Sequence, residues 1–169
     1  YLFESLVSGT YKVQFVAPAG TKLTTANTGA DDANDSDANQ TTGMTGNYII
    51  DTTFPVGSIQ RDNRTVDAGI VPLGSIGDYV WSDTDSDGQQ DGTEAGIAGV
   101  KVYLLNGSGT KIDSTVTDAA GKYLFDSLVA GNYQVQFVKP VGSTLTTADT
   151  GSDVTDSDAN PTDGKSQVV

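Results

Sequence analysis

Apolar and polar residues alternate along short stretches of the chain, and turn-forming residues separate these stretches. In the segment 99–105, Val100, Val102 and Leu104 alternate with more polar neighbours, as in a strand with one buried face. The Asn-Gly-Ser-Gly sequence at 106–109 then predicts a hairpin turn. The other predicted strands are 75–81, 111–117, 122–125, 133–138, 48–54, 66–71 and one that begins at residue 167.

No long stretch shows the 3.6-residue period of a helix, so the pattern predicts an all-β protein. Short strands at regular spacing favour an antiparallel Greek-key β-sandwich of immunoglobulin-like or transthyretin-like type. The aromatic residues expected in its core are Trp81, Tyr79, Phe125, Tyr133 and Phe137.

The chain contains an internal repeat. Residues 1–29 and 123–151 are identical at 20 of 29 positions, at an offset of 122, and DSDAN at 35–39 recurs at 156–160, at an offset of 121. The repeat length is therefore about 121 residues. We expect residues 1–73 to be the C-terminal part of one repeat without its first strands. Residues 74–169 would be the next repeat without its final strands.

A twelve-residue acidic loop, DTDSDGQQDGTE at 83–94, follows the first predicted strand of the second repeat. Its oxygen-bearing residues occupy the ligand positions of an EF-hand calcium loop, and Gly88 stands at the sixth position, where the loop turns sharply. The predicted ligands are Asp83, Asp85, Asp87, the carbonyl of Gln89, Asp91 and Glu94. Because predicted strands flank the loop, we expect Ca²⁺ to act as a permanent structural clamp rather than as a signal.

Composition narrows the possible functions. The net charge is −13, and 20 of the 22 acidic residues are Asp, so nucleic acid and anionic membranes are not expected partners. Cysteine and histidine are absent, which removes disulfides, thiol chemistry and the commonest general base. We therefore expect that the protein is not an enzyme. The sequence has no long apolar run, so we expect no membrane insertion and place any export signal or anchor outside these residues.

The segments IGDYVWSDTDSDGQQDGTEAGIAGVKVYLL and TDAAGKYLFDSLVAGNYQVQF resemble the calcium-binding B domain of serine–aspartate repeat surface adhesins, a family related to collagen-adhesin B-type domains. The resemblance implies a β-sandwich that holds several Ca²⁺ ions. It also implies an extracellular stalk in which neighbouring repeats of the same chain are the partners.

The same resemblance adds candidate ligands outside the loop. A second calcium site is implied at the DSD segments, with Asp153, Asp156 and Asp158 in the second repeat and Asp31, Asp35 and Asp37 in the first. Asp78 and Asp67 are weaker candidates for such sites. From the residues alone, the DSD segments are equally compatible with solvated acidic loops.

The leading hypothesis is a calcium-stiffened structural module of a tandem-repeat cell-surface protein. One alternative is an adhesive module that itself binds a protein or a glycan. Another is a filament subunit whose identical chains complete one another by strand addition. Asn-x-Ser/Thr motifs, which are glycosylation acceptors in some proteins, occur at Asn34, Asn39, Asn63 and Asn106.

Overall fold

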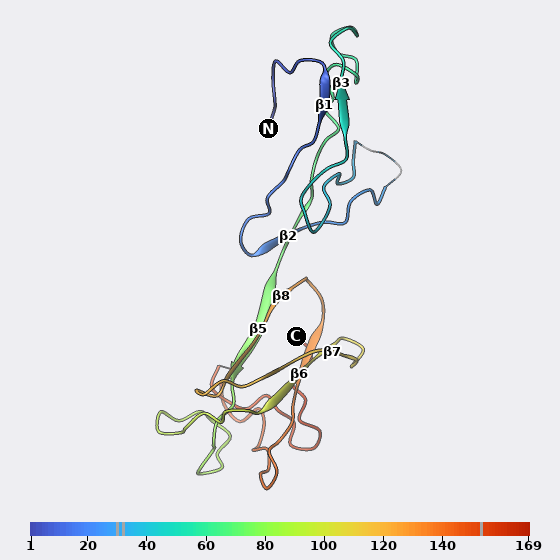
Figure 1. The fold of residues 1–169 in the computed structure, drawn as a ribbon. Coiled ribbons are helices and arrows are strands. Elements are labelled where there is room, and N and C mark those ends of the chain that lie inside the picture. The colour runs from blue at the N-terminus through green and yellow to red at the C-terminus, as the bar shows by residue number, and fades with distance from the viewer. Residues whose placement is uncertain (30, 32, 153) are drawn as a thin grey trace. The chain divides into compact units, whose positions relative to one another are not determined.

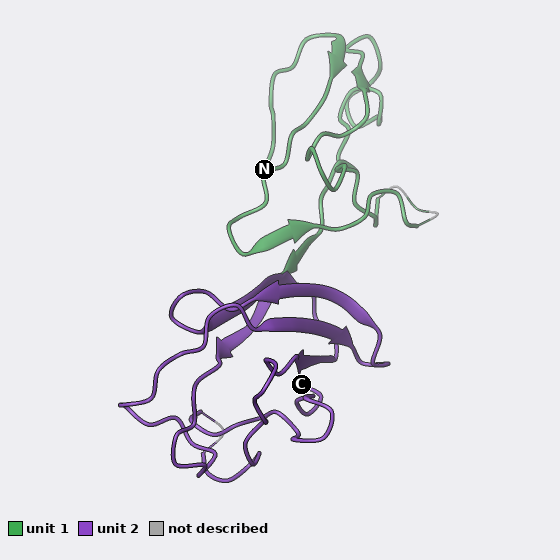
Figure 2. Cartoon of the chain, turned by 60° about the horizontal axis from the view of Figure 1, so that its bottom comes forward, with its two compact units in different colours: residues 1–73 green, residues 74–169 purple. Residues whose placement is uncertain are grey.

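The computed structural model describes residues 1–29, 31, 33–152 and 154–169, and its regular elements in these residues are all strands. The described chain divides into two compact units, Tyr1–Leu73 and Gly74–Val169, which Figure 2 colours separately. All strand pairs are antiparallel. The prediction of an all-β antiparallel fold is confirmed.

Unit 2, residues 74–169, contains two sheets (Figure 1). The first pairs β5 with β8, and the second has the order β7-β6-β9. The bounds are β5 Gly74–Tyr79, β6 Lys101–Asn106, β7 Lys111–Val116, β8 Lys122–Leu128 and β9 Tyr133–Phe137. The turn at 106–109 joins β6 to β7 as predicted, because the Asn106 side chain accepts a hydrogen bond from the Ser108 N–H at 3.1 Å.

The core of unit 2 lies between these two sheets. Val102, Leu104, Phe125 and Val135 are each at most 3% exposed and form one cluster. The alternation along β6 therefore correctly marked its buried face. Tyr133, Phe137 and other half-buried side chains pack around this cluster.

Two aromatic residues expected in the core lie outside this cluster. Tyr79 ends β5, and the chain then leaves the sheet toward the acidic loop. The Tyr79 and Trp81 rings stack on each other with centroids 6.3 Å apart and planes only 2° from parallel. Both residues are half-buried, and the Tyr79 hydroxyl donates a hydrogen bond to the Glu94 carbonyl at 3.3 Å, at the end of the loop.

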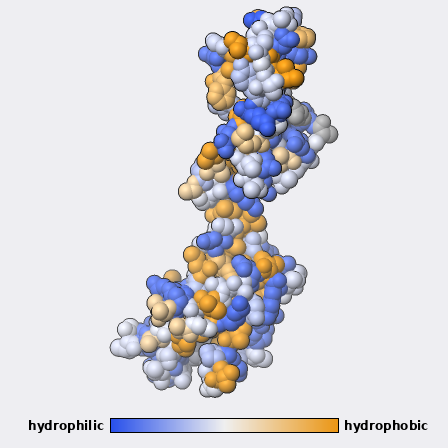
Figure 3. Space-filling view, viewed as in Figure 1, coloured by the Kyte–Doolittle hydropathy of each residue, from blue (hydrophilic) through white to orange (hydrophobic). Residues whose placement is uncertain are grey.

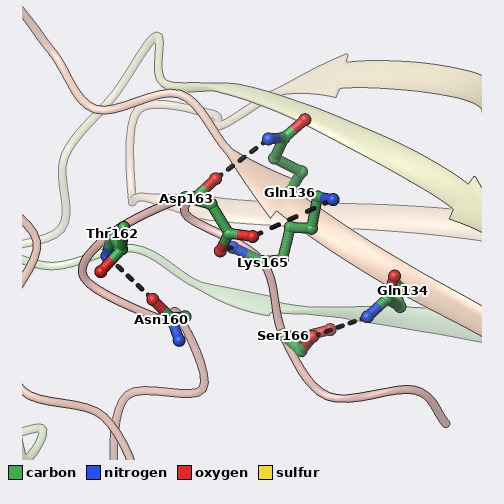
Figure 4. Close-up of polar contacts among 7 residues, drawn as sticks. All are labelled: Gln134, Gln136, Asn160, Thr162, Asp163, Lys165 and Ser166. Carbon is green, nitrogen blue, oxygen red and sulfur yellow. Dashed lines mark hydrogen bonds and ion pairs between the residues drawn. The ribbon is translucent and has the colours of Figure 1, made fainter. Parts of the chain in front are cut away.

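The C-terminal segment runs antiparallel beside β9 (Figure 4). The side-chain amide of Gln134 donates a hydrogen bond to the carbonyl of Ser166 at 3.2 Å. Further along, Val169 and Tyr133 exchange both of their backbone hydrogen bonds, at 2.8 and 2.9 Å. The segment that was predicted to begin a strand at residue 167 thus pairs with β9 through an isolated bridge and individual backbone bonds, and it forms no assigned strand.

Unit 1, residues 1–73, has two small sheets of three-residue strands. The strands are β1 Gly9–Tyr11, paired with β3 Tyr48–Ile50, and β2 Thr21–Leu23, paired with β4 Ile70–Pro72. The predicted strand 48–54 is cut short because the Asp51 side chain accepts hydrogen bonds from the N–H and hydroxyl of Thr53, which turns the chain.

Apolar side chains near the start of unit 1 are unusually exposed. Tyr1, Leu2 and Phe3 are 74%, 59% and 60% exposed. Figure 3 shows hydrophobic residues interspersed with hydrophilic ones on the face in view. In unit 2 the equivalent residues 123–125 lie on β8 and pair with β5. Residues 1–73 include no counterpart of β5, which accounts for this exposure.

Candidate metal site

Backbone pairing closes the base of the acidic loop. Trp81 and Gly96 form an antiparallel bridge on either side of it. The Ser82 N–H donates to the Ala95 carbonyl at 2.9 Å, next to this bridge. The structure therefore confirms that β-type pairing, and no helix within the described residues, flanks the loop.

Three carboxylates converge inside the loop. One oxygen from each of Asp83, Asp85 and Asp87 lies within 4.8 Å of the others, and among the described residues this is the group of acidic side chains able to hold a metal ion. Asp83 is half-buried and the other two are exposed. Alternate residues of a tight loop thus deliver carboxylate oxygens to one place, which is the arrangement that a divalent cation requires.

The loop backbone holds the first carboxylate in position. Asp83 accepts hydrogen bonds from the N–H groups of Ser86 at 2.7 Å and Gly88 at 3.0 Å. Gly88 has a φ of +81°, and a Cβ at this position would lie 2.5 Å from the Thr147 carbonyl oxygen. The turn therefore requires glycine at the sixth loop position for both backbone conformation and space.

The pKa values of the Asp83 and Asp85 carboxyls are shifted in opposite directions. The hydroxyl of Thr146 donates to Asp83 and, with the loop N–H groups, lowers the pKa of that carboxyl. Desolvation raises the pKa of Asp85, and the negative charges of Asp87 and Asp83 add to the increase. A bound cation would relieve this repulsion among like charges.

Glu94, at the twelfth loop position, spans the loop. Its Oε1 accepts hydrogen bonds from the N–H of Thr84 at 2.6 Å and from its hydroxyl at 3.2 Å. Its Oε2 accepts from the N–H of Asp91 at 3.2 Å. The half-buried Glu94 side chain thus links the beginning of the loop to its end, with both oxygens directed into the loop.

The DSD segment of unit 2 packs against the loop through backbone bonds. The Ser157 N–H donates to the Gly88 carbonyl at 3.0 Å, and the Gln90 N–H donates to the Thr155 carbonyl at 2.7 Å. These two bonds surround the bridge between Gln89 and Asp156. Neither uses the Gln89 carbonyl, which is the oxygen expected at the seventh ligand position.

The carboxylates of that segment have separate surroundings. Asp156 is 7% exposed and accepts a hydrogen bond from the Gly151 N–H at 2.8 Å. Asp158 and Asp78 are exposed and both raise the pKa of the Tyr123 phenol, after the larger effect of burial. The predicted ligand Asp153 lies outside the described residues.

In unit 1, Asp37 connects three segments of the chain. It is 6% exposed and accepts hydrogen bonds from the hydroxyl of Tyr48 at 2.6 Å and from the N–H of Asp67 at 2.8 Å. Asp37 and Asp67 also raise the pKa of the Tyr1 phenol, after burial as the main cause. The two weaker candidates, Asp78 and Asp67, therefore each lie beside a tyrosine near the second Asp of a DSD segment.

The remaining acids predicted in unit 1 stabilise turns. Asp31 accepts a hydrogen bond from the Asn34 side chain at 2.6 Å, and Asp35 accepts one from the Gly29 N–H at 2.8 Å. The other oxygen of Asp35, Oδ1, is buried without a hydrogen-bond partner, as is Oγ of Ser36. Unit 1 includes no counterpart of the acidic loop that packs on this segment in unit 2.

Two threonines at the site were not predicted. The hydroxyl of Thr146 contacts Asp83, and that of Thr150 donates to the Asp87 carbonyl at 3.1 Å. Both belong to the segment LTTADTG, which recurs as LTTANTG at 23–29. That recurrence was the available signal, but the sequence does not show that the segment meets a loop 63 residues away.

Three of the four Asn-x-Ser/Thr motifs form local turns. In each, the Asn side-chain oxygen accepts a hydrogen bond from the N–H two residues later, at 2.9–3.1 Å, which is the geometry of an Asx turn. These motifs begin at Asn39, Asn63 and Asn106. Turn formation is a sufficient structural reason for the motif at these positions.

An antiparallel sandwich that carries a carboxylate-lined, strand-flanked loop defines an all-β module with a candidate site for a divalent cation. The model of the SdrD B-like domain matches residues 1–70 and 74–169. The chain therefore belongs to the SdrD B-like domain family.

Several curated relatives of the chain are staphylococcal proteins. Serine-aspartate repeat-containing protein C of Staphylococcus aureus strain Newman is 48% identical over 165 residues, which cover 96% of this chain and 16% of that relative. The proteins of the same name from strains USA300 and COL match equally well. The chain thus spans about one sixth of the length of these relatives.

Membership in this family makes the chain an extracellular surface-protein repeat module, in which neighbouring repeats belong to the same chain. The family is one of structural repeat domains rather than of enzymes. Within the residues that the structure describes, no helix is long and apolar enough to cross a membrane.

Proposed function

We propose that the chain is a calcium-stiffened structural module of a surface stalk, without enzymatic activity. The observation that carries the proposal is the convergence of the Asp83, Asp85 and Asp87 carboxylates within 4.8 Å. At neutral pH such a group of negative charges repels itself, and a divalent cation is the simplest compensation.

The chemistry of the donors favours calcium. The candidate ligands are all oxygens: the carboxylates of Asp83, Asp85, Asp87, Asp91 and Glu94 and the carbonyl of Gln89. The chain has no cysteine or histidine, which zinc and copper sites commonly use. Ca²⁺ takes six to eight oxygens in flexible geometry, whereas Mg²⁺ requires a smaller octahedral site and retains water.

Binding at this loop would stabilise the whole of unit 2. The loop is held to the DSD segment by the Ser157–Gly88 and Gln90–Thr155 backbone bonds. A cation that fixes the loop therefore also fixes a segment more than 60 residues away in sequence. Because strand pairing closes the base of the loop, no helix pair is present there to open on binding, and the ion serves as a clamp.

Further ions would bind near the DSD segments. In unit 2, Asp158 and Asp78 lie near the Tyr123 phenol, and Asp156 and Asp153 are the other acids of that segment. In unit 1, the corresponding donors are Asp37, which contacts Asp67, and the other acids of the same segment, Asp31 and Asp35. We place these sites second to the loop because, among the described residues, only Asp83, Asp85 and Asp87 bring three carboxylate oxygens together.

Single-molecule force spectroscopy tests this mechanical role. The chain is pulled from its two ends in buffer with Ca²⁺ and again with a calcium chelator. The proposal predicts a higher unfolding force for unit 2 in Ca²⁺, since an ion that binds only the folded loop stabilises the folded state. Equal unfolding forces in the two buffers would contradict it.

A further inference from the structure

The β7-β6-β9 sheet of unit 2 has an outer face, which turns away from the core. Val102 and Leu104 of β6 point into the core, so the alternating residues Lys101 and Tyr103 point to the outer face. β6 is the central strand of this sheet and is paired with β7 on one side and β9 on the other. The register of these two ladders therefore shows which other residues share the outer face.

A row of polar side chains crosses the outer face at Tyr103. Ser114 of β7 is directly opposite Tyr103 on one side, and Gln136 of β9 is opposite it on the other. Gln136 in turn forms an antiparallel bridge with Lys165, and Figure 4 shows these two residues beside each other. Directly opposite residues of antiparallel strands share one face. With the pairs formed by Leu105, the outer face comprises Lys101, Tyr103, Lys111, Ser114, Gln134, Gln136 and Lys165.

Two ammonium groups converge on the ring of Tyr103. Nζ of Lys111 lies 3.6 Å from the ring centroid, and Nζ of Lys101 lies 5.6 Å from it. The Lys101 ammonium also donates a hydrogen bond to Oγ of Ser114 at 2.8 Å. Because the face of an aromatic ring attracts cations, Tyr103 holds both lysines in place on the sheet. Within the described residues, neither of these two ammonium groups forms an ion pair.

Acidic side chains are almost absent from the three strands. β6, β7 and β9 contain a single acidic residue, Asp113. It is directly opposite the core residue Leu104, so it lies on the other side of the sheet from Tyr103. Unit 2 has five lysines and no arginine, and three of these lysines belong to the outer face. A chain with a net charge of −13 thus presents one positively charged face.

The third lysine extends the positive charge across the sheet. Lys165 is two strands away from β6, which corresponds to about 10 Å. Its ion pair with Asp163 is 3.9 Å long and partly exposed, and such pairs contribute little, so the ammonium can still bind another anion. A single small anion cannot reach Lys165 and the lysines at Tyr103 together. A ligand that uses all three must carry anionic groups at intervals along a chain.

The hydrogen-bonding groups of the outer face distinguish between classes of polyanion. The backbone of β6 is used on both edges, and β9 is bonded to β6 and to the C-terminal segment, so a peptide finds no free strand edge to extend. The amides of Gln134 and Gln136 each donate to a backbone carbonyl. Within the described residues, their own oxygens accept no hydrogen bond, and they suit ligands that carry hydroxyl groups.

We propose that the outer face binds an anionic polysaccharide, with its anionic groups at Lys101, Lys111 and Lys165 and its hydroxyls at the glutamine amides. Lysine acts as a compact point charge and suits oxyanions such as sulfate and phosphate esters. The cation–π contacts to Tyr103 reduce the side-chain entropy that the lysines lose on binding. The stalk module would then hold a charged glycan as well as act as a spacer.

The net negative charge of the chain sets the conditions for this interaction. Repulsion opposes the distant approach of any polyanion, but at physiological ionic strength charges are screened beyond about 8 Å. The local charge of the outer face therefore decides binding at close range. Because the attraction is electrostatic, the affinity should fall as salt is added.

The test uses the full 169-residue chain in buffer with Ca²⁺. The probe is fluorescently labelled dextran sulfate, and uncharged dextran of the same length is the control ligand. Binding is followed by fluorescence anisotropy and by amide chemical shifts of the isotope-labelled chain. We expect saturable binding of dextran sulfate with shifts on β6, β9 and Lys165, and no binding of dextran.

Substitutions of lysine locate the binding face. Lys101→Gln and Lys111→Gln should each weaken binding about fivefold, since each removes one charge contact at about 4 Å. Lys122→Gln is the matched control, because Lys122 is an exposed lysine of β8, in the other sheet, and it should leave the affinity unchanged. Lys111→Arg retains the charge and should bind as wild type does, which shows that loss of charge rather than of folding weakens the glutamine variants.

Four results would overturn the proposal: no binding of dextran sulfate, equal binding of dextran, an equal loss in Lys122→Gln, or tighter binding of polyaspartate. The last would assign the outer face to an acidic polypeptide. Glu94→Gln separates the face from the calcium loop. Retained binding in this variant agrees with the proposal, whereas binding lost in Glu94→Gln but unchanged in both lysine-to-glutamine variants would show that loop-bound Ca²⁺ bridges to the sulfate and would refute it.

Discussion

Replacement of Glu94 by glutamine should weaken calcium binding more than any other single change from acid to amide in the loop. Glu94 directs both carboxylate oxygens into the loop, where they accept the Thr84 N–H at 2.6 Å and the Asp91 N–H at 3.2 Å. Glutamine has one carbonyl oxygen, so it can replace only one of these acceptors. The substitution therefore removes a charge, a proposed calcium ligand and one bond that joins the ends of the loop.

The expected loss of calcium affinity in Glu94→Gln follows from the removed charge. At a calcium–oxygen distance of about 2.4 Å and a water-like dielectric constant of about 80, one lost charge weakens the interaction with Ca²⁺ by about 3 kcal/mol. The amide oxygen retains part of this, which leaves about 2 kcal/mol, or roughly thirtyfold in Kd. Asp91 acts through water in such loops, at about twice the distance, so Asp91→Asn should weaken binding only about fivefold.

Isothermal titration calorimetry with Ca²⁺ measures both variants directly. The chain provides a matched control, because its only other glutamate, Glu4, is exposed and lies in unit 1. Glu4→Gln should leave the loop affinity unchanged. Wild-type affinity in Glu94→Gln, or a larger loss in Asp91→Asn, would refute the assignment of the twelfth position.

Three further substitutions test the surroundings of the loop. Gly88→Ala should destabilise unit 2 more than Gly109→Ala in chemical denaturation. Both glycines have a positive φ, but only at Gly88 would the added Cβ clash with a carbonyl oxygen. Equal losses of unfolding free energy in the two variants would contradict this. Thr146→Val should raise the pKa of the Asp83 carboxyl in an NMR titration, because the hydroxyl bond lowers it below its ordinary 3.8. The stability linked to this lowered pKa is present above about pH 4 and is lost as the pH falls through the folded value, so the variant should lose less stability in acid; an unchanged pKa would exclude the bond. Tyr123 should resist ionisation in an ultraviolet titration with Tyr123→Phe as the reference, because burial and two carboxylates raise its pKa. The stability of the folded chain should therefore fall as the pH rises above 10. Ionisation of Tyr123 at the ordinary pH of a tyrosine would contradict its burial.

Local patterns predicted much of the fold and of the candidate site. The alternation on β6 correctly identified Val102 and Leu104 as core residues, because a strand places alternate side chains on opposite faces. The loop pattern identified three Asp residues that the structure brings within 4.8 Å. In both cases the interacting residues are close in sequence, so spacing alone determines their geometry.

Features that depend on distant segments could not be predicted in this way. The predicted strand 66–71 starts four residues too early because Asp67 is bound by Asp37, 30 residues away, rather than by a ladder. Tyr79 and Trp81 are apolar enough for the core, but the chain turns out of the sheet after Tyr79. The contact between Thr146 and Asp83 likewise depends on the packing of two loops.

Thermal unfolding of the chain in excess Ca²⁺ and in excess chelator tests the central claim most directly. At a hundredfold excess of Ca²⁺ over its Kd, binding to the folded loop adds about 2.7 kcal/mol of stability. For a domain of this size that corresponds to a rise in Tm of about 10 °C or more. Calcium stabilisation predicts this rise for wild type and a much smaller one for Glu94→Gln, whereas the same Tm in Ca²⁺ and in chelator would contradict it.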